Sequence, residues 1–165
     1  MTKSLYIVRH AKSSWDEPEL ADEERPLLEK GVQKTYKVID YLNERQVTVD
    51  LILSSPAVRA YETARLIAQG IRYPVENISR IQDIYHLDTQ QMLNKLTGLS
   101  DEIHSVMIVG HNPGVTQLAS LLLGKQLDWL PTSAVVGIEF STHQWQEIAG
   151  ARRAVLFMIH PRMLT

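Results

Sequence analysis

Apolar residues along the chain follow two periods, one typical of buried strands and the other typical of helices. Five short apolar runs predict strands near residues 5–9, 49–55, 105–110, 133–140 and 153–159. Between these runs, apolar residues recur every three or four positions and predict helices at about 28–45, 56–70, 89–98 and 114–124. The alternation predicts an α/β fold: a three-layer α/β/α sandwich whose mostly parallel central sheet carries helices on both faces.

The first and second helices carry further signals. In the first helix, Val32, Tyr36, Ile39 and Leu42 form one apolar stripe, which we expect to face the sheet. Pro56 suits the first turn of the second helix, because its fixed φ angle and missing N–H are tolerated there.

The composition narrows the class of protein. The chain has 165 residues, of which 44% are hydrophobic and 22% charged, as expected of one globular domain spanning residues 1–165. The net charge of -2 disfavours a general nucleic-acid binder. The sequence contains no cysteine, which excludes disulfides, thiol nucleophiles and thiolate metal sites.

Targeting signals are also missing from the sequence. The N-terminus has no signal-peptide core, and no apolar run approaches the ~20 residues of a membrane span. We therefore expect a cytoplasmic protein with neither a membrane nor a nucleic acid as partner. The sequence does not indicate an oligomeric state, and a monomer is compatible with it.

Polar side chains that can form hydrogen bonds follow three of the predicted strands. Arg9 and His10 follow the first strand, Ser54-Ser55-Pro56 leads from the second strand to Arg59, and His111-Asn112-Pro113 follows the third. Because parallel strands end at one edge of the sheet, we expect these corners to share a crevice at its carboxyl edge.

Two arginines and two histidines in one crevice predict a site for a phosphoryl group. The planar arginine fork stays charged and bonds two phosphate oxygens together. A neutral imidazole can attack phosphorus when its other ring nitrogen is held as N–H. Hydrolysis would then pass through a phosphohistidine, with a carboxyl group assisting the leaving group and then the water, and would need no metal or other cofactor.

Each of these side chains also has a purely structural alternative. His10 could be a hydrogen-bonded strand end, Arg59 could pair with Glu62 along a helix face, and His111 could cap a helix. The remaining histidines are expected on the surface or in packing roles, and the acidic segment 15–24 on a solvated rim or facing the substrate. Nucleotide-cradle motifs and H-E-x-x-H are absent from the sequence.

Three motifs in order, LYIVRHAKSSW, LILSSPAVRAYETA and VMIVGHNPGV, resemble those of the histidine phosphatase superfamily. Ala11 replaces the glycine of the Arg-His-Gly signature. The compact chain, with ADEERPLLEKG and LPTSAVVGIEF, looks most like the SixA-type phosphohistidine phosphatases. The resemblance implies the phosphoglycerate mutase-like form of the α/β fold and no metal.

The resemblance also implies roles for matching residues. His10 looks like the phosphorylated nucleophile, Arg9 and Arg59 like the phosphate-binding arginines, and His111 like the second histidine of the pocket. Ser13 and Asn112, within the same motifs, are added as candidate substrate-binding residues.

The general acid is less clearly marked. Larger members of the superfamily use a glutamate before the third helix, where RIQDIYH offers Asp83, with His86 as an alternative donor and a helix-flanking acid as the structural alternative. An imidazole leaving group, with a pKa near ~6.5, needs a strong acid less than an alkoxide does. The lack of a clearly marked general acid in the sequence therefore favours a phosphohistidine substrate.

We expect a metal-independent hydrolase, a phosphohistidine phosphatase or phosphomonoesterase, whose partner is a phosphohistidine protein or a small phosphomonoester. The alternatives are a small-molecule phosphatase of the same superfamily and a phosphate-binding module without turnover. A mutase is disfavoured because it must shield its phosphoenzyme from water, and a metalloenzyme because no helical histidine pair supports it.

Overall fold

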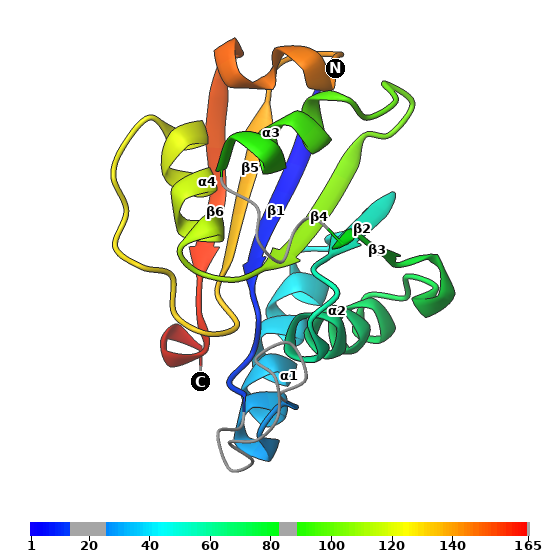
Figure 1. Ribbon diagram of the computed structural model, residues 1–165, viewed down its shortest axis with the longest axis vertical. Coiled ribbons are helices and arrows are strands. Elements are labelled where there is room, and N and C mark those ends of the chain that lie inside the picture. Colours follow the sequence, from blue (N-terminus) through cyan, green and yellow to red (C-terminus); the bar gives the residue numbers. More distant parts are fainter. Residues whose placement is uncertain (14–25, 83–88, 165) are drawn as a thin grey trace.

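A six-stranded sheet forms the centre of the computed structural model, which describes residues 1–13, 26–82 and 89–164 (Figure 1). Its strand order is β3-β2-β4-β1-β5-β6. The strands are β1 Lys3–Arg9, β2 Leu51–Ser54, β3 Ser79–Arg80, β4 Ser105–Gly110, β5 Val135–Phe140 and β6 Arg153–Ile159. The α-helices are α1 Glu29–Glu44, α2 Val58–Gly70, α3 Thr89–Thr97 and α4 Gly114–Leu123, and short 3-10 helices are η2 Val75–Asn77, η4 Trp145–Gly150 and η5 Pro161–Met163.

The sheet is mostly parallel, as predicted. β1 pairs in parallel with β4, β4 with β2, and β2 with β3. β5 is antiparallel to both of its neighbours, β1 and β6, so that among the described strands β5 alone runs against the rest. This reversal lets β5 begin at the edge where β1 and β4 end.

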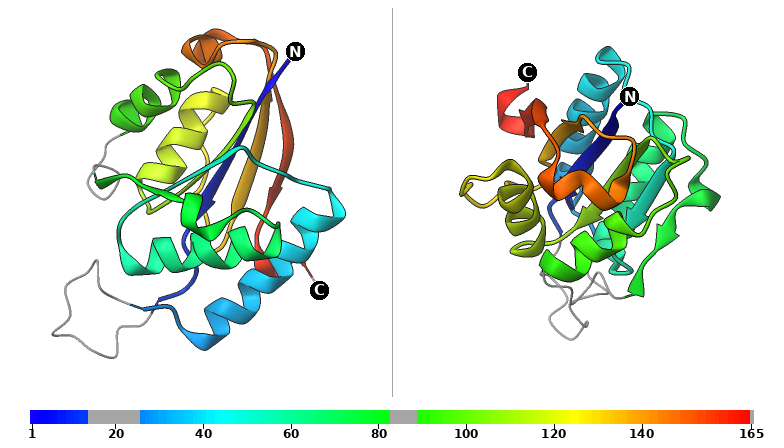
Figure 2. Two further views of the ribbon diagram at one scale, coloured as in Figure 1. Left: turned by 90° about the vertical axis from the view of Figure 1, so that its right-hand side faces the viewer. Right: turned by 90° about the horizontal axis from the view of Figure 1, so that it is seen from above.

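Helices cover both faces of the sheet, in agreement with the predicted three layers. Side chains alternate along β1: Leu5 and Ile7 pack toward α3 and α4, while Tyr6 and Val8 pack toward α1 and α2. Figure 2 shows the two helix pairs on opposite sides of the strands. Burial on both faces explains why the central strands are nearly continuous apolar runs.

The predicted strands and helices are present within a few residues of their expected ends, but three details differ. Pro56, predicted in the first turn of the second helix, lies before that turn, because the N-cap of α2 is Ala57. The two-residue strand β3 was not predicted, since so short a segment has no periodicity to read. The predicted stripe of α1 is wrong at Tyr36, which is 46% exposed.

The buried face of α1 is set by a close approach of the chain. Its buried residues are Gly31, Thr35, Val38, Ile39 and Leu42. A Cβ on Gly31 would lie 2.6 Å from the Lys12 carbonyl oxygen, so α1 packs directly on the segment after β1. Thr35 belongs to this face because its hydroxyl donates to the Gly31 carbonyl (2.8 Å) and lies 2.9 Å from the Ser133 hydroxyl. Across the described ranges, the structure contains no helix with the length and apolar character needed to cross a membrane.

Candidate active site

The carboxyl ends of β1, β4 and β2 lie side by side and form the edge at which the candidate site is built. In the parallel ladder Arg9 pairs with Gly110, and Ser54 pairs with Val109. The backbone N–H of His10 donates to the Gly110 carbonyl (3.1 Å), which extends the ladder by one residue. The three polar corners therefore open on one edge, the place where open α/β sheets bind ligands.

His10 and Arg59 are in direct contact. His10 is 7% exposed and Arg59 is 4% exposed. The His10 Nδ1 lies 2.7 Å from the Ala11 carbonyl oxygen, and Arg59 Nε–H donates to His10 Nε2 (3.3 Å). Because a carbonyl oxygen can only accept, these contacts assign the proton to Nδ1 and the lone pair to Nε2. In this tautomer, Nε2 is the nitrogen that can act as a nucleophile.

His111 lies next to His10 across the strand ends. The two ring centroids are 5.4 Å apart and the ring planes are inclined by 57°. His111 Nε2 lies 2.6 Å from the Ser55 hydroxyl, which also accepts the Ala57 N–H (3.2 Å). Ser55 thus orients the second histidine, whereas the sequence placed Ser55 in one of the polar corners without giving it a role. Its signal was the position at a strand end immediately before Pro56.

No carboxylate among the described residues balances the charge of Arg9. Its Nη1 donates to the Leu130 carbonyl (2.9 Å). Its Nε is buried and, among the described residues, has no hydrogen-bond partner, nor does any described carboxylate pair with Arg9. Burial, and after it the charge of Arg59, lowers the pKa of Arg9 from its ordinary value. Arginine stays protonated even so, and a bound anion would relieve both effects.

A threonine of α2 ties Arg59 to the segment after β1. Thr63 Oγ1 donates to the Arg59 carbonyl one turn earlier (2.7 Å) and accepts the backbone N–H of Ala11 (2.9 Å). Because Ala11 also supplies the carbonyl that holds His10, Thr63 couples the positions of the two contacting side chains. A threonine four residues after an arginine, on one helix face, was the signal that could have found it.

The structure thus brings together His10, Arg59 and His111, with Arg9 at the end of β1. The Asn112 side chain bonds to the protein at both ends: Nδ2 donates to the Leu130 carbonyl (2.9 Å) and Oδ1 accepts the Thr116 hydroxyl (2.5 Å). Ser13 is 7% exposed and pairs with Leu27 in an isolated antiparallel bridge.

Three expectations lie outside the described residues. They concern Asp83 as the general acid, His86 as its alternative, and the acidic segment 15–24. Among the residues that are described, no group of three or more histidine and acidic side chains is arranged to hold a metal ion.

The chain matches known proteins by sequence. A sequence model of the histidine phosphatase superfamily (branch 1) matches residues 5–99. An uncharacterized chloroplastic protein of Arabidopsis thaliana is 30% identical over 157 residues, which cover 89% of this chain and 71% of that protein. The phosphohistidine phosphatase SixA of Escherichia coli (strain K12) is 26% identical over 153 residues, which cover 86% of this chain and 91% of SixA.

Solved structures agree on the fold. A protein histidine phosphatase SixA, solved with tungstate, superposes with a TM-score of 0.84 at 21% identity, covering 98% of this chain and 99% of that one. A phosphoglycerate mutase from Bacillus anthracis str. Sterne gives 0.62 at 16% identity, covering 90% and 96%. The phosphoglycerate mutase-like fold and the resemblance to the SixA type, both predicted from the sequence motifs, are confirmed. With the family model matching more than half of its length, the chain belongs to the histidine phosphatase superfamily, branch 1.

Proposed function

We propose that this phosphatase removes the phosphoryl group from phosphohistidine on a protein and carries it as a covalent intermediate on His10. The observation that carries the proposal is the pair of contacts on the His10 ring. Nδ1–H is held by the Ala11 carbonyl, and the Nε2 lone pair faces the Arg59 guanidinium. This combination presents a nucleophilic nitrogen beside a group that binds phosphate oxygens.

In the first step, the Nε2 lone pair of His10 forms a bond to phosphorus while the bond to the leaving group breaks. The leaving nitrogen departs with the electron pair of that bond and takes up a proton. The Arg59 N–H that now donates to Nε2 is released as that nitrogen becomes bonded to phosphorus, and it becomes available to a phosphoryl oxygen. Arg9 and His111 supply further donors as negative charge spreads over the oxygens.

In the second step, water attacks phosphorus and the bond to His10 Nε2 breaks. The imidazole recovers its electron pair and phosphate leaves, with one proton of the water passing to a base. The ring keeps its Nδ1–H bond to the Ala11 carbonyl in both steps. The Nδ1–H bond stabilises the ring orientation while Nε2 is first bonded to phosphorus and then released.

A phosphohistidine substrate fits the chemistry of the leaving group. An imidazole leaves readily with little help from a strong acid, whereas an alcohol does not. The Escherichia coli relative that is named a phosphohistidine phosphatase supports this substrate class. Asp83 remains our proposed general acid, and its removal should slow turnover of alcohol phosphates more than turnover of phosphohistidine.

The proposal is tested by trapping the intermediate. We expect a brief reaction with a radiolabelled phosphohistidine protein, quenched in alkali because phosphohistidine is labile in acid, to leave label on the wild-type enzyme. His10→Ala should carry no label and turn over at background rate. His143→Ala, which removes an exposed histidine far along the chain, is the matched control and should behave like wild type.

Equal turnover by His10→Ala would contradict the mechanism. Turnover restricted to small phosphomonoesters would contradict the protein substrate and favour a small-molecule phosphatase. Tight phosphate binding with no turnover of any substrate would favour a binding module.

A further inference from the structure

A closed set of hydrogen bonds surrounds the backbone N–H and carbonyl of Leu130, the two groups called here the Leu130 peptide, in the segment that joins α4 to β5. The Leu130 N–H donates to Thr116 Oγ1 (2.9 Å), and Thr116 Oγ1–H donates to Asn112 Oδ1 (2.5 Å). Asn112 Nδ2 then donates to the Leu130 carbonyl (2.9 Å). Thr116 and Leu130 are both 4% exposed, so these bonds form away from solvent.

The direction of each bond follows from the one before it. A backbone N–H can only donate, so Thr116 Oγ1 must accept from Leu130 and use its own hydrogen elsewhere. That hydrogen points to Asn112, which therefore turns its oxygen toward Thr116 and its NH₂ toward the Leu130 carbonyl. The Thr116 hydroxyl and the Leu130 carbonyl together determine the orientation of the Asn112 amide.

The Leu130 carbonyl is also the acceptor for Arg9 Nη1 (2.9 Å). Two donors, from Asn112 and Arg9, share this single oxygen. Because the guanidinium is planar and rigid, fixing Nη1 restrains the plane of the whole group and the aim of its buried Nε. The position of the Leu130 peptide is therefore transmitted to Arg9.

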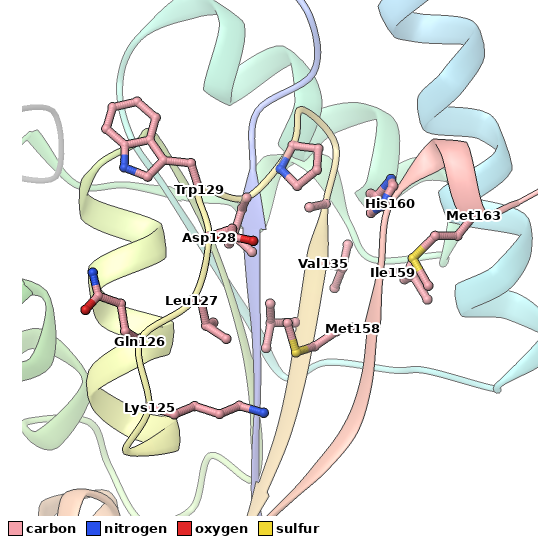
Figure 3. Close-up of a pocket in the computed structure, with 14 residues that line it drawn as sticks. Lys125, Gln126, Leu127, Asp128, Trp129, Val135, Met158, Ile159, His160 and Met163 are labelled. Atoms are coloured by element: carbon pink, nitrogen blue, oxygen red, sulfur yellow. The ribbon is translucent and has the colours of Figure 1, made fainter.

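Hollows lie on both sides of the segment that joins α4 to β5. One hollow has a volume of about 510 Å³. Figure 3 shows Leu127 of this segment on one side of it and Val135 and Met158 on the other. Hydrogen bonds to Ser120 and Thr116 of α4 tether the segment between these hollows.

We propose that Thr116 is a positioning residue for phosphate binding: by fixing Asn112 and the Leu130 peptide, it orients the Arg9 guanidinium. The inference rests on the proposed function only in that Arg9 is taken to bind the phosphoryl group. Thr116 itself does not touch the reacting atoms.

The test compares variants that remove or keep the hydroxyl. We expect Thr116→Val to weaken tungstate binding about tenfold, the size of effect expected when a buried hydrogen-bonded group loses its partner. Thr116→Ser should bind as wild type does. Ser120→Ala is the matched control: Ser120 lies one turn later on α4 and accepts the Leu127 N–H (3.1 Å), a tether of the same segment that does not reach Arg9.

Two readouts separate positioning from general damage. In an Arg9→Ala background, Thr116→Val should weaken tungstate binding no further, because the residue acts through Arg9. The NMR signal of the Arg9 Nε–H group, assigned by its loss in Arg9→Lys, should shift in Thr116→Val and stay in place in Ser120→Ala. This second readout needs no ligand and no turnover, so it stands even if the proposed activity fails. Thr116→Ala removes the same hydroxyl and replaces Thr116→Val if the latter does not fold.

An unshifted Arg9 signal in the variants without the hydroxyl would overturn the inference. So would an equal loss of tungstate affinity with and without Arg9.

Discussion

At the scale of single residues, the site depends on hydroxyl groups that touch no substrate in the proposed reaction. Ser55 contacts His111, and Thr63 connects Arg59 with the backbone beside His10. The Thr63 hydroxyl donates and accepts at once, which a single polar atom of arginine or lysine cannot do. Short polar side chains therefore set the geometry that the longer ones use.

Thr63→Val should lower both the stability of the protein and the activity of the site. The substitution keeps the shape of the side chain but leaves the buried Ala11 N–H without its acceptor, so we expect a loss of about 1–3 kcal/mol in the free energy of unfolding. Since the Ala11 carbonyl orients His10, kcat should fall about tenfold as well. Urea unfolding and steady-state kinetics measure the two effects. Thr63→Ser should recover both the stability and kcat. An unchanged kcat in Thr63→Val would contradict the coupling between Thr63 and His10.

The sequence predicted the side chains of the site better than the contacts that hold them. Arg9, His10 and His111 follow strand ends, and strand ends can be predicted from apolar runs. The carbonyls of Ala11 and Leu130 could not be predicted, because every residue carries a backbone carbonyl and only the folded path shows which ones approach a side chain.

At the scale of elements, α1 shows where periodicity succeeds and where it fails. The helix was predicted to within a residue at each end, but Tyr36 was placed on the buried face, where the structure has Thr35. Apolar spacing alone could not reveal that a glycine contact and a buried hydroxyl set the rotation of the helix. Local sequence determines that a helix forms, whereas its tertiary contacts determine which side faces inward.

Gly31→Ala should disturb this contact. The added Cβ would lie 2.6 Å from the oxygen and 3.0 Å from the nitrogen of Lys12, which are backbone atoms that cannot move aside cheaply. We expect a loss of about 1–3 kcal/mol in the free energy of unfolding, typical of overpacking. Gly150→Ala is the control, since no atom lies within 4 Å of its added Cβ. Equal stability of the two variants, measured by chemical denaturation, would refute the role assigned to Gly31.

At the scale of the whole molecule, the proposed nucleophile directly follows β1, an interior strand of the sheet. β1 pairs along its length with β4 and with β5, and most of its side chains are buried. The backbone N–H of His10 extends the β1–β4 ladder by one bond, so the backbone position of His10 depends on the middle of the sheet. Catalytic geometry and global stability should therefore be lost together.

Heating should show this coupling directly. We expect the loss of phosphatase activity, assayed at each temperature, to follow the same transition as the loss of far-ultraviolet circular dichroism. Inactivation several degrees below the unfolding of the sheet would show instead that the site opens locally.

The reversed direction of β5 has a consequence for protein design. Because β5 starts at the carboxyl edge, the chain after α4 must travel back along the sheet, and on that path it delivers the Leu130 carbonyl to Arg9. If β5 were parallel, the chain would enter it from the opposite edge, and that acceptor would be lost. Transplanting these arginine and histidine positions into an all-parallel scaffold should thus require a substitute acceptor for Arg9, introduced from a separate loop.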